Sequence, residues 1–386
     1  MTDIQKVVSK FESLYSNSPL LISSPGRINL IGEHTDYHDG FVLPAAIDKK
    51  MVLAFAKNNT QKVRLFSVDF NKEFICNISD IKITTTAWAN YILGVIDQLQ
   101  KKNHKIEGFD CVFSSNIPMG SGLSSSAALE CGIGYGLNEL FDLKVSKIDL
   151  IKFAQKAEHN FAGVMCGIMD QFASVMGKKD YVFQLDCRSL AYNYFPFNQE
   201  EYQFVLCNSG VKHSHADSGY NTRRNESEEG VSELKKKYPK VSHLRDVSID
   251  MLDSIRTTIS QIIYNRCRYV IEENNRVIKS CEALKNNDIF TFGNLMYESH
   301  NGLSNLYEVS CEEVDFLVDF TRNNKNILGS RMMGGGFGGC SINLVKRTEK
   351  DLFLNNIKHA YQQKYNLELE CYEVEISNGT SVIEVV

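Results

Sequence analysis

The sequence lacks any Cys-x-x-Cys pair, although 11 of its 386 residues are cysteine. The cysteines are scattered along the chain and their number is odd, so we expect neither a disulfide framework nor a zinc site. Free cysteines of this kind are typical of a reducing compartment, which predicts a cytoplasmic protein.

Signals for export and for membrane insertion are also missing. The first residues, Met1 to Lys6, have neither the charged start nor the apolar run of a signal peptide. No apolar run approaches the ~20 residues that a membrane-spanning helix requires. We therefore expect no membrane partner.

An excess of positive charge is absent as well. The chain has 42 basic and 47 acidic residues, which gives a net charge of −5. A general grip on nucleic acid requires clustered Lys and Arg. The densest basic run, Lys235 to Lys237, is short and typical of a solvated helix end. The composition therefore disfavours a nucleic-acid partner.

The order of predicted elements favours an α+β fold, and the length predicts about two domains. Helical periodicity predicts helices at 4–16, 88–100, 124–140, 147–162, 223–237, 258–285, 287–299 and 311–323. Residues 20–80, 111–113, 181–186 and 203–209 are strand-like, and the last 60 residues predict strand, glycine loop, strand, helix and strand. Because Pro196 interrupts the pattern, we place the domains at 1–197 and 198–386.

The stretch from Gly26 to Tyr37 gathers polar side chains where a predicted strand runs out into a loop. Its charged or titratable members are Arg27, Glu33, His34 and Asp36. Gly32 permits a sharp change of chain direction beside them. Each of these residues alone would be an ordinary turn residue, but the four together favour a site for the hydroxyl groups of a small polar ligand.

The segment from Pro118 to Ala128 is rich in glycine and serine and leads into a predicted helix. Gly120 and Gly122 let the backbone approach a ligand closely. The serines can cap the helix, whose N-terminal N–H groups and dipole favour an anion such as a nucleotide phosphate. The segment is neither a Walker A loop nor a dinucleotide fingerprint. A simple turn with a good N-cap is the alternative.

Two carboxylates follow in and after the next predicted helix. Glu158 could bind Mg²⁺, which in proteins usually takes one or two carboxylates together with phosphate oxygens and water. Asp170 stands in mixed apolar surroundings, and near a cation such as Arg27 it could act as a base. A helix N-cap is the alternative role for Asp170.

Later segments supply a candidate hydroxyl and a second glycine loop. Tyr220 could offer its hydroxyl to a substrate, whereas Arg223 and Arg224 are expected on the surface of a helix. Residues 334–339 contain five glycines and predict a tight, ordered turn between strands. The glycines inside the helix predicted at 124–140 each cost about 1 kcal/mol against Ala, so we expect them to pack closely against a neighbour. They are Gly132, Gly134 and Gly136.

Taken together, these segments resemble the galactokinases of the GHMP kinase superfamily. Three motifs match in order, namely 26–37, 118–128 and 334–340, and the segments 167–171 and 220–224 match as well. The second motif is shared across the superfamily, whereas 33–36 is the part specific to galactokinases. The resemblance implies a two-domain GHMP kinase fold. Its N-terminal domain would be like domain 2 of ribosomal protein S5, its C-terminal domain would be ferredoxin-like, and the active site would lie between them.

The resemblance also implies an activity, the ATP-dependent phosphorylation of galactose at its C1 hydroxyl, and a role for each site residue. Asp170 would be the base, and Arg27 would keep it ionised and stabilise charge during the transfer. The sugar would contact Glu33, His34, Thr35, Asp36, Gly167 and Tyr220. ATP phosphates would contact Gly120, Ser121, Gly122, Leu123, Ser124, Ser125 and Ser126. Mg²⁺ would be bound by Ser126 and Glu158. Galactose and ATP would be the binding partners of a monomeric enzyme.

The chain departs from the family pattern at two positions. His38 stands where the family usually has Asn, and Ser227 follows the arginine pair where Cys is common. Other functions stay open as alternatives. A related N-acetylgalactosamine kinase would need space beside the C2 hydroxyl. A non-catalytic sugar sensor is disfavoured by the intact phosphate loop and by Asp170, and a structural or nucleic-acid-binding module of the S5-like fold is disfavoured by the acidic composition.

Overall fold

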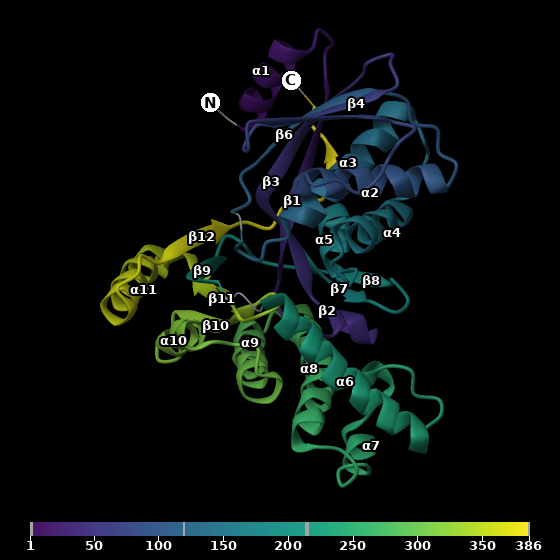
Figure 1. The fold of residues 1–386 in the computed structure, drawn as a ribbon. Coiled ribbons are helices and arrows are strands. Elements are labelled where there is room, and N and C mark those ends of the chain that lie inside the picture. Colours follow the sequence, from purple (N-terminus) through teal and green to yellow (C-terminus); the bar gives the residue numbers. More distant parts are fainter. Residues whose placement is uncertain (1–2, 119, 213–215, 385–386) are drawn as a thin grey trace.

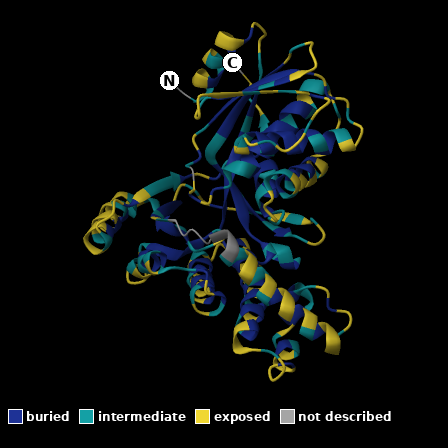
Figure 2. Ribbon diagram, in the orientation of Figure 1, coloured by how far each residue is buried: buried dark blue, intermediate teal, exposed yellow. Residues whose placement is uncertain are grey.

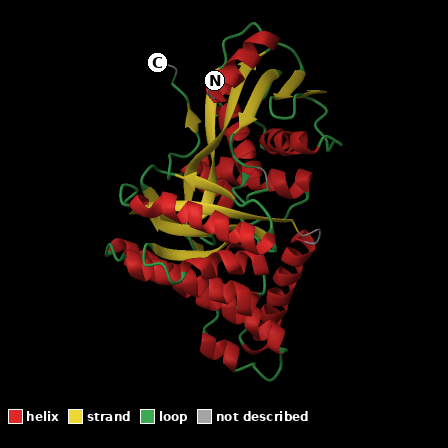
Figure 3. Cartoon of the chain, turned by 90° about the vertical axis from the view of Figure 1, so that its left-hand side faces the viewer, coloured by secondary structure: helices red, strands yellow, loops and turns green. Residues whose placement is uncertain are grey.

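The structure, a computed structural model, describes residues 3–118, 120–212 and 216–384. Its strands form three sheets with helices packed on and between them (Figure 1). The buried residues follow the strands and the inner faces of the helices, while the outer helix faces are exposed (Figure 2). The two ends of the chain lie near the same end of the molecule (Figures 1 and 3).

The first sheet has six strands in the order β13-β1-β3-β6-β4-β5. Their bounds are β1 Leu20–Asn29, β3 Pro44–Lys57, β4 Lys62–Ser67, β5 Lys72–Asn77, β6 Phe109–Ser115 and β13 Ser381–Val382. Strand β3 shows how the sheet is covered on both faces. Val52 and Ala54 pack with α1 (Asp3–Leu14), whereas Leu53 and Phe55 lie in the core on the other face. This alternation is the two-residue period of a strand buried on both sides.

Helix α3 (Ser125–Phe141) lies on the second face of this sheet, beside helices α2 (Ala87–Lys101), α4 (Lys147–Ala157) and α5 (Met169–Met176). A Cβ atom on Gly132 would lie 2.6 Å from Leu53, and one on Gly136 would lie 2.4 Å from Phe55. The predicted close packing is therefore confirmed at these two glycines. Gly134 has ordinary clearance, with its nearest neighbours at 3.5 Å.

The second sheet is antiparallel, with strands in the order β10-β11-β9-β12. Its strands are β9 Tyr202–Lys212, β10 Ile327–Met333, β11 Gly338–Lys346 and β12 Glu370–Val374. Helices α9 (Ile289–Gly302), α10 (Glu312–Thr321) and α11 (Lys350–Tyr365) pack against it. The small third sheet is formed by β2 (Phe41–Val42), β7 (Tyr181–Asp186) and β8 (Tyr192–Pro196).

A helical lobe extends away from the sheets and contains α6 (Ala216–Lys237), α7 (Ile249–Asp253) and α8 (Gln261–Lys285). The short elements η1 (Asp36–His38), η3 (Leu244–Asp246) and η5 (Arg347–Glu349) are 3₁₀ turns. Two other short elements are π-helical, η2 (Glu158–Ala162) and η4 (Leu303–Tyr307). Since π-turns often occur at functional sites, Glu158 and Tyr307 are of special interest.

The predicted α+β fold is confirmed, and most predicted helices and strands are found within a few residues of their expected positions. The helix predicted at 223–237 is an exception, because α6 already begins at Ala216. Its first turns contain Asp217, Ser218 and Gly219, residue types that are typical of turns. Lys235 to Lys237 form the exposed end of this helix, as expected.

The division of the chain at residues 197 and 198 stays a prediction. Strand β13 returns from the C-terminal part to pair with β1, so the last residues pack on the first sheet. All 11 cysteines are free in the structure. Among the helices of the described residues, none combines the length and the apolar character needed to cross a membrane.

Candidate active site

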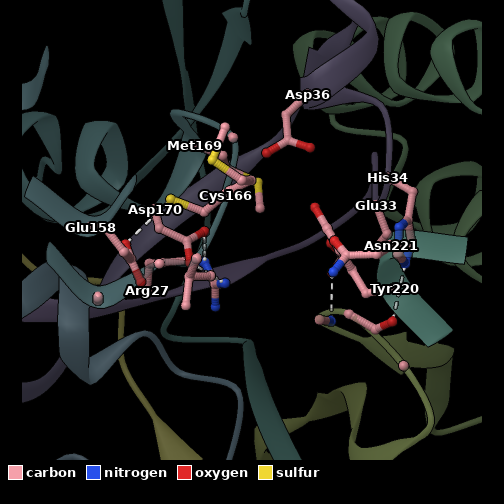
Figure 4. Close-up of a pocket in the computed structure, with 18 residues that line it drawn as sticks. Arg27, Glu33, His34, Asp36, Glu158, Cys166, Met169, Asp170, Tyr220 and Asn221 are labelled. Carbon is pink, nitrogen blue, oxygen red and sulfur yellow. Dashed lines mark hydrogen bonds and ion pairs between the residues drawn. The ribbon is translucent and has the colours of Figure 1, made fainter. Parts of the chain in front are cut away.

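A cavity of about 460 Å³ lies where the ends of several elements meet. Figure 4 shows Arg27, Asp170 and Glu158 on one side and Glu33 and His34 on the other. Four separate segments line the cavity, and their lining residues are Arg27, Glu33, His34, Asp36, Glu158, 162–167, Met169, Asp170, Tyr220, Asn221 and 334–336. The fold therefore brings together the first motif, the two carboxylates, the tyrosine and the second glycine loop.

Arg27 and Asp170 form a two-point ion pair on the wall of this cavity. Arg27 Nε donates to Asp170 Oδ1 at 2.7 Å, and Nη2 donates to Oδ2 at 2.8 Å. Arg27 comes from the end of β1, and Asp170 lies in the first turn of α5, whose N-cap is Ile168. The alternative role of Asp170 as an N-cap is therefore wrong. Burial lowers the pKa of Arg27, but the charge and hydrogen bonds of Asp170 outweigh burial and leave this pKa raised.

Asp36 lies against Gly167 at the edge of the cavity. A Cβ atom on Gly167 would lie only 1.7 Å from Asp36 Oδ2, so any side chain there would displace the carboxylate. Burial, reinforced by the charges of Asp170 and Glu33, raises the pKa of Asp36 to about 7. The carboxyl of Asp36 therefore titrates near neutral pH.

Glu33 and His34 join the first motif to the second glycine loop. Glu33 Oε1 accepts a hydrogen bond from the N–H of Gly334 at 2.8 Å and pairs with Arg331 at 3.1 Å. His34 Nε2 lies 3.2 Å from the carbonyl oxygen of Gly335. These bonds hold residues 334 and 335 over one side of the cavity, and the loop is a short turn between β10 and β11, as predicted.

Buried and exposed residues alternate along the glycine-serine loop. Ser121 and Leu123 are buried, and Ser121 Oγ donates to the carbonyl of Pro118 at 2.7 Å. Gly120 and Gly122 are exposed, and Ser124, Ser125 and Ser126 are partly exposed where α3 begins. Exposed backbone beside a helix N-terminus is the arrangement that binds phosphate groups.

The expected capping of this helix by a serine side chain is wrong in detail. Ser124 is the N-cap residue of α3, but its backbone is left-handed (φ 59°) and its side chain makes no capping bond. Its hydroxyl donates to Asp170 Oδ2 instead. The Ser124 hydroxyl therefore bonds Asp170 and does not cap the helix. This bond links the glycine-serine loop to the carboxylate.

Ser126 and Glu158 are close enough to share a cation. Ser126 Oγ donates to Glu158 Oε1 at 3.1 Å, and the amide of Gln171 donates to Glu158 Oε2 at 2.7 Å. Burial and the charge of Asp170 raise the pKa of Glu158. One hydroxyl and one carboxylate beside the glycine-serine loop fit the donor set of Mg²⁺, which would complete its shell with phosphate oxygens and water.

Some predicted site residues do not face the cavity. Thr35 is fully buried, and its hydroxyl donates to the carbonyls of Gly32 and Phe41 at 2.9 and 2.7 Å. It shapes the turn that carries its neighbours. Arg223, which we expect on the surface of a helix, is less exposed than that: its side chain is 15% exposed, and its Nε donates to the carbonyl of Tyr307 at 2.6 Å. Arg224 is partly exposed and pairs with Glu228 at 2.8 Å.

Sequence reasoning did not single out several residues of the cavity wall. Val164, Met165 and Cys166 lie in the short connection after η2, and Asn221 follows Tyr220 on α6. Cys166 Sγ lies 3.3 Å from Glu158 Oε2. Three of the four carry no motif, and only Asn221 stands inside a segment that the family resemblance included.

Comparisons with known proteins agree with this geometry. Three family models match the chain, the GHMP kinases N terminal domain at residues 90–178, the GHMP kinases C terminal at 280–363 and the galactokinase galactose-binding signature at 9–57. Mevalonate kinase has the same fold, with a TM-score of 0.63 at 20% identity over 93% of this chain and 99% of that one. The fold and the motifs define a GHMP kinase.

The more similar relatives narrow the assignment. Galactokinase of Thermotoga maritima is 40% identical over 94% of this chain and 99% of its own, and that of Clostridium acetobutylicum is 41% identical over 98% of each. The crystal structure of Lactococcus lactis galactokinase complexed with galactose matches with a TM-score of 0.94 at 32% identity, over 99% of this chain and all of the other. The chain belongs to the galactokinase family.

Proposed function

We propose that this protein transfers the γ-phosphoryl group of ATP to the C1 hydroxyl of galactose, giving galactose 1-phosphate and ADP. The observation that carries the proposal is the Arg27–Asp170 ion pair, which lines the same cavity as Glu33 and Asp36 and contacts the glycine-serine loop. A base, a set of sugar-binding acceptors and a phosphate loop then adjoin one another. The similarity to a galactokinase solved with galactose supports the choice of sugar.

Asp170 is the base in this mechanism. A carboxylate accepts the proton of the C1 hydroxyl as the oxygen attacks the γ-phosphorus, and such a base contributes roughly 10²–10⁴-fold to the rate. The bonds from Arg27 and Ser124 hold both carboxylate oxygens in fixed positions. Positioning of this kind, together with electrostatic stabilisation, supplies most of the catalysis in phosphoryl transfer.

Arg27 has two tasks. Its two hydrogen bonds fix the orientation of the Asp170 carboxylate, and its positive charge stabilises the negative charge that spreads over the phosphoryl oxygens. The guanidinium Nη1 of Arg27 donates to the carbonyl of Gly122 at 2.5 Å, and the backbone N–H of Arg27 donates to the carbonyl of Leu123 at 3.1 Å. The guanidinium is therefore tied to the phosphate loop as well as to the base.

The charge balance of the cavity supports a requirement for Mg²⁺. Four carboxylates line the cavity, but Arg27 is the only Lys or Arg among the lining residues of the described chain. The carboxylates are Glu33, Asp36, Glu158 and Asp170. The phosphates of ATP beside Asp170 and Glu158 would be repelled by these two carboxylates without added positive charge. Ser126 and Glu158 would hold the Mg²⁺, which neutralises charge on the phosphate oxygens when bound.

Glu33 and Asp36 choose the sugar in this proposal. Glu33 Oε1 is engaged by Gly334 and Arg331, whereas Asp36 accepts the N–H of Tyr37 at 3.0 Å and faces Gly167. Carboxylates accept hydrogen bonds from sugar hydroxyls, and a sugar that lacks a matching hydroxyl leaves a buried carboxylate unpaired. The pair therefore discriminates by geometry rather than by apolar fit.

The test is a turnover assay with ATP, Mg²⁺ and one sugar at a time, in which ADP release is coupled to absorbance and the product is identified by phosphorus NMR. Galactose should be phosphorylated at C1 with the highest kcat/KM, and glucose, its C4 epimer, should react poorly. A clearly higher kcat/KM for N-acetylgalactosamine would reject the galactose assignment. Absence of ADP release with every sugar would support a non-catalytic sensor.

A further inference from the structure

A chain of hydrogen bonds leads from the helical lobe to His34 in the cavity wall. Tyr307 Oη lies 2.8 Å from Tyr37 Oη, and Tyr37 Oη lies 2.8 Å from His34 Nδ1. The other ring nitrogen, Nε2, lies 3.2 Å from the carbonyl oxygen of Gly335. We call these three side chains and this carbonyl the hydroxyl chain.

The members of the hydroxyl chain come from three distant parts of the sequence. His34 precedes η1, and Tyr37 lies within it. Tyr307 is the last residue of η4, and Gly335 lies in the loop between β10 and β11. Arg223 anchors Tyr307 by donating to its carbonyl at 2.6 Å. Tyr307 is fully buried and His34 is 4% exposed, so water does not replace these bonds.

The direction of each bond follows from its partners. A carbonyl oxygen can only accept, so His34 Nε2 must carry a hydrogen to bond Gly335. A neutral imidazole has one N–H, and Nδ1 is then an acceptor that takes the hydroxyl hydrogen of Tyr37. Tyr37 has no second hydrogen to give, so Tyr307 donates to Tyr37. The chain therefore runs in one direction, from Tyr307 to Gly335.

The neutral state of His34 is supported by its surroundings. Burial lowers its pKa to about 3, and the charges of Arg223 and Arg331 act in the same direction. The aromatic rings of Tyr37, Tyr220 and Tyr307 pack around the imidazole, with centroids 4.9–5.9 Å away. The ring can neither take a second proton easily nor rotate without displacing these neighbours.

We propose that Tyr37 and Tyr307 are positioning residues that hold His34 as its Nε2–H tautomer. His34 then donates its one N–H to the carbonyl of Gly335, which holds the second glycine loop at the cavity wall beside Glu33. This inference rests on the proposed function for the identity of the ligand, a sugar, but the tautomer itself does not depend on the activity. Gly334 and Gly335 line the cavity, so the backbone that this bond fixes is part of the wall that a sugar would contact.

The direct test is the tautomer of His34 in the ligand-free protein. Protein labelled with ¹⁵N in histidine is recorded by long-range ¹H–¹⁵N correlation, and the His34 signals are identified by their loss in His34→Asn. We expect a protonated Nε2 and an unprotonated Nδ1 that accepts a hydrogen bond. A protonated Nδ1, or fast exchange between both tautomers, would overturn the proposal, whatever the protein phosphorylates.

The variant test separates positioning from simple support of the fold. Tyr37→Phe removes the donor to Nδ1, so His34 should show a mixture of tautomers, and the KM for galactose should rise about threefold to tenfold, the scale of one neutral hydrogen bond. The kcat should change by less than about twofold, because Asp170 and Arg27 are untouched. Tyr307→Phe should give the same effects in weaker form. Unchanged His34 signals and an unchanged KM in Tyr37→Phe would contradict the proposal.

Tyr264→Phe is the matched control. Tyr264 is a buried tyrosine whose hydroxyl donates to Asp253 at 2.6 Å on the helical lobe, outside the cavity lining. Its loss removes a comparable buried hydroxyl and lowers stability without altering the signals of His34. A rise in the galactose KM of this control equal to that of Tyr37→Phe would assign the effect to general destabilisation and overturn the positioning role.

Discussion

Arg27 and Asp170 are held together by two parallel hydrogen bonds of 2.7 and 2.8 Å, across 143 residues of sequence. Two-point pairing between a guanidinium and a carboxylate fixes orientation as well as charge, which a single ammonium cannot do. The pair therefore fixes the orientation of the Asp170 carboxylate at the cavity wall. The chemical proposal depends on this geometry more than on any other contact in the cavity.

Arg27→Lys tests the pairing geometry while it keeps the positive charge. Lysine has one compact ammonium, so the second bond to Asp170 and the bond to Gly122 cannot both be replaced. We expect kcat to fall roughly tenfold or more, the scale for loss of a preorganised donor. Steady-state kinetics with galactose and ATP measure it, and an effect confined to KM would show that Arg27 only binds substrate.

Arg64→Lys is the control for this variant. Arg64 makes the same two-point pair with Asp110, with both bonds at 2.6 Å, on strands β4 and β6 and away from the cavity lining. Its replacement should lower stability and leave kcat and KM unchanged.

Glu158→Gln tests the proposed metal site. The amide keeps the shape of the side chain but loses the negative charge that attracts Mg²⁺. We expect the Mg²⁺ concentration for half-maximal turnover to rise roughly tenfold or more, by analogy with other altered metal sites. Glu282→Gln removes the same charge from an exposed position on α8 and should leave the Mg²⁺ dependence as it is. Equal Mg²⁺ curves for wild type and Glu158→Gln would reject the assignment.

Asp36 predicts a pH dependence of stability. Its pKa is raised to about 7 by burial and by the charges of Asp170 and Glu33, whereas an unfolded aspartate titrates near 3.9. The folded state therefore binds the extra proton between these values, and the contribution of Asp36 to the free energy of unfolding falls as pH rises through that window. The asparagine in Asp36→Asn cannot ionise, so the variant lacks this pH-dependent contribution to the free energy of unfolding.

The measurement is urea denaturation of wild type and Asp36→Asn from about pH 4 to pH 7.5. The stability of wild type relative to the variant should decrease with rising pH by up to about 4 kcal/mol, since the shift is roughly three pKa units and each unit corresponds to ~1.4 kcal/mol. Parallel plots of stability against pH for the two proteins would mean that the pKa of Asp36 is not raised in the folded state.

Two glycines of α3 predict opposite effects of the same substitution. Gly136→Ala would place a methyl group 2.4 Å from Phe55, so it should destabilise the protein by about 1–3 kcal/mol. Gly134→Ala meets its nearest neighbours at 3.5 Å and should gain up to about 1 kcal/mol of helix propensity. Denaturation midpoints of both variants compare the two sites. Equal shifts in the same direction would show that α3 is not packed as described.

Much of the fold could be predicted because its helices and strands have strong periodicity. The strand at 181–186 was predicted with its observed bounds, and α2 and α3 within one residue at each end. The start of α6 was missed, because Asp217, Ser218 and Gly219 look like a turn when read locally. Gly219 lies against Phe337 of the second glycine loop and the later turns of the helix pack on α8, and neither contact is visible in local sequence.

The site was predictable as a set of segments but not as a set of contacts. The sequence predicts that a serine side chain caps α3, yet Ser124, its N-cap residue, donates its hydroxyl to Asp170, 46 residues away. The two departures from the family pattern, His38 and Ser227, lie 2.8 Å apart and form a buried hydrogen bond. Neither contact follows from spacing, because each depends on how separate elements pack. The roles assigned to the site residues stay predictions until they are measured.

The most direct test of the proposed function is the kcat of Asp170→Asn, measured together with its affinity for galactose by calorimetry. The account predicts a kcat lower by roughly 10²–10⁴-fold, with the dissociation constant for galactose changed only a fewfold. Asp110→Asn, which breaks the matching pair with Arg64, should keep the wild-type kcat. A near-normal kcat in Asp170→Asn would contradict the assignment of Asp170 as the base.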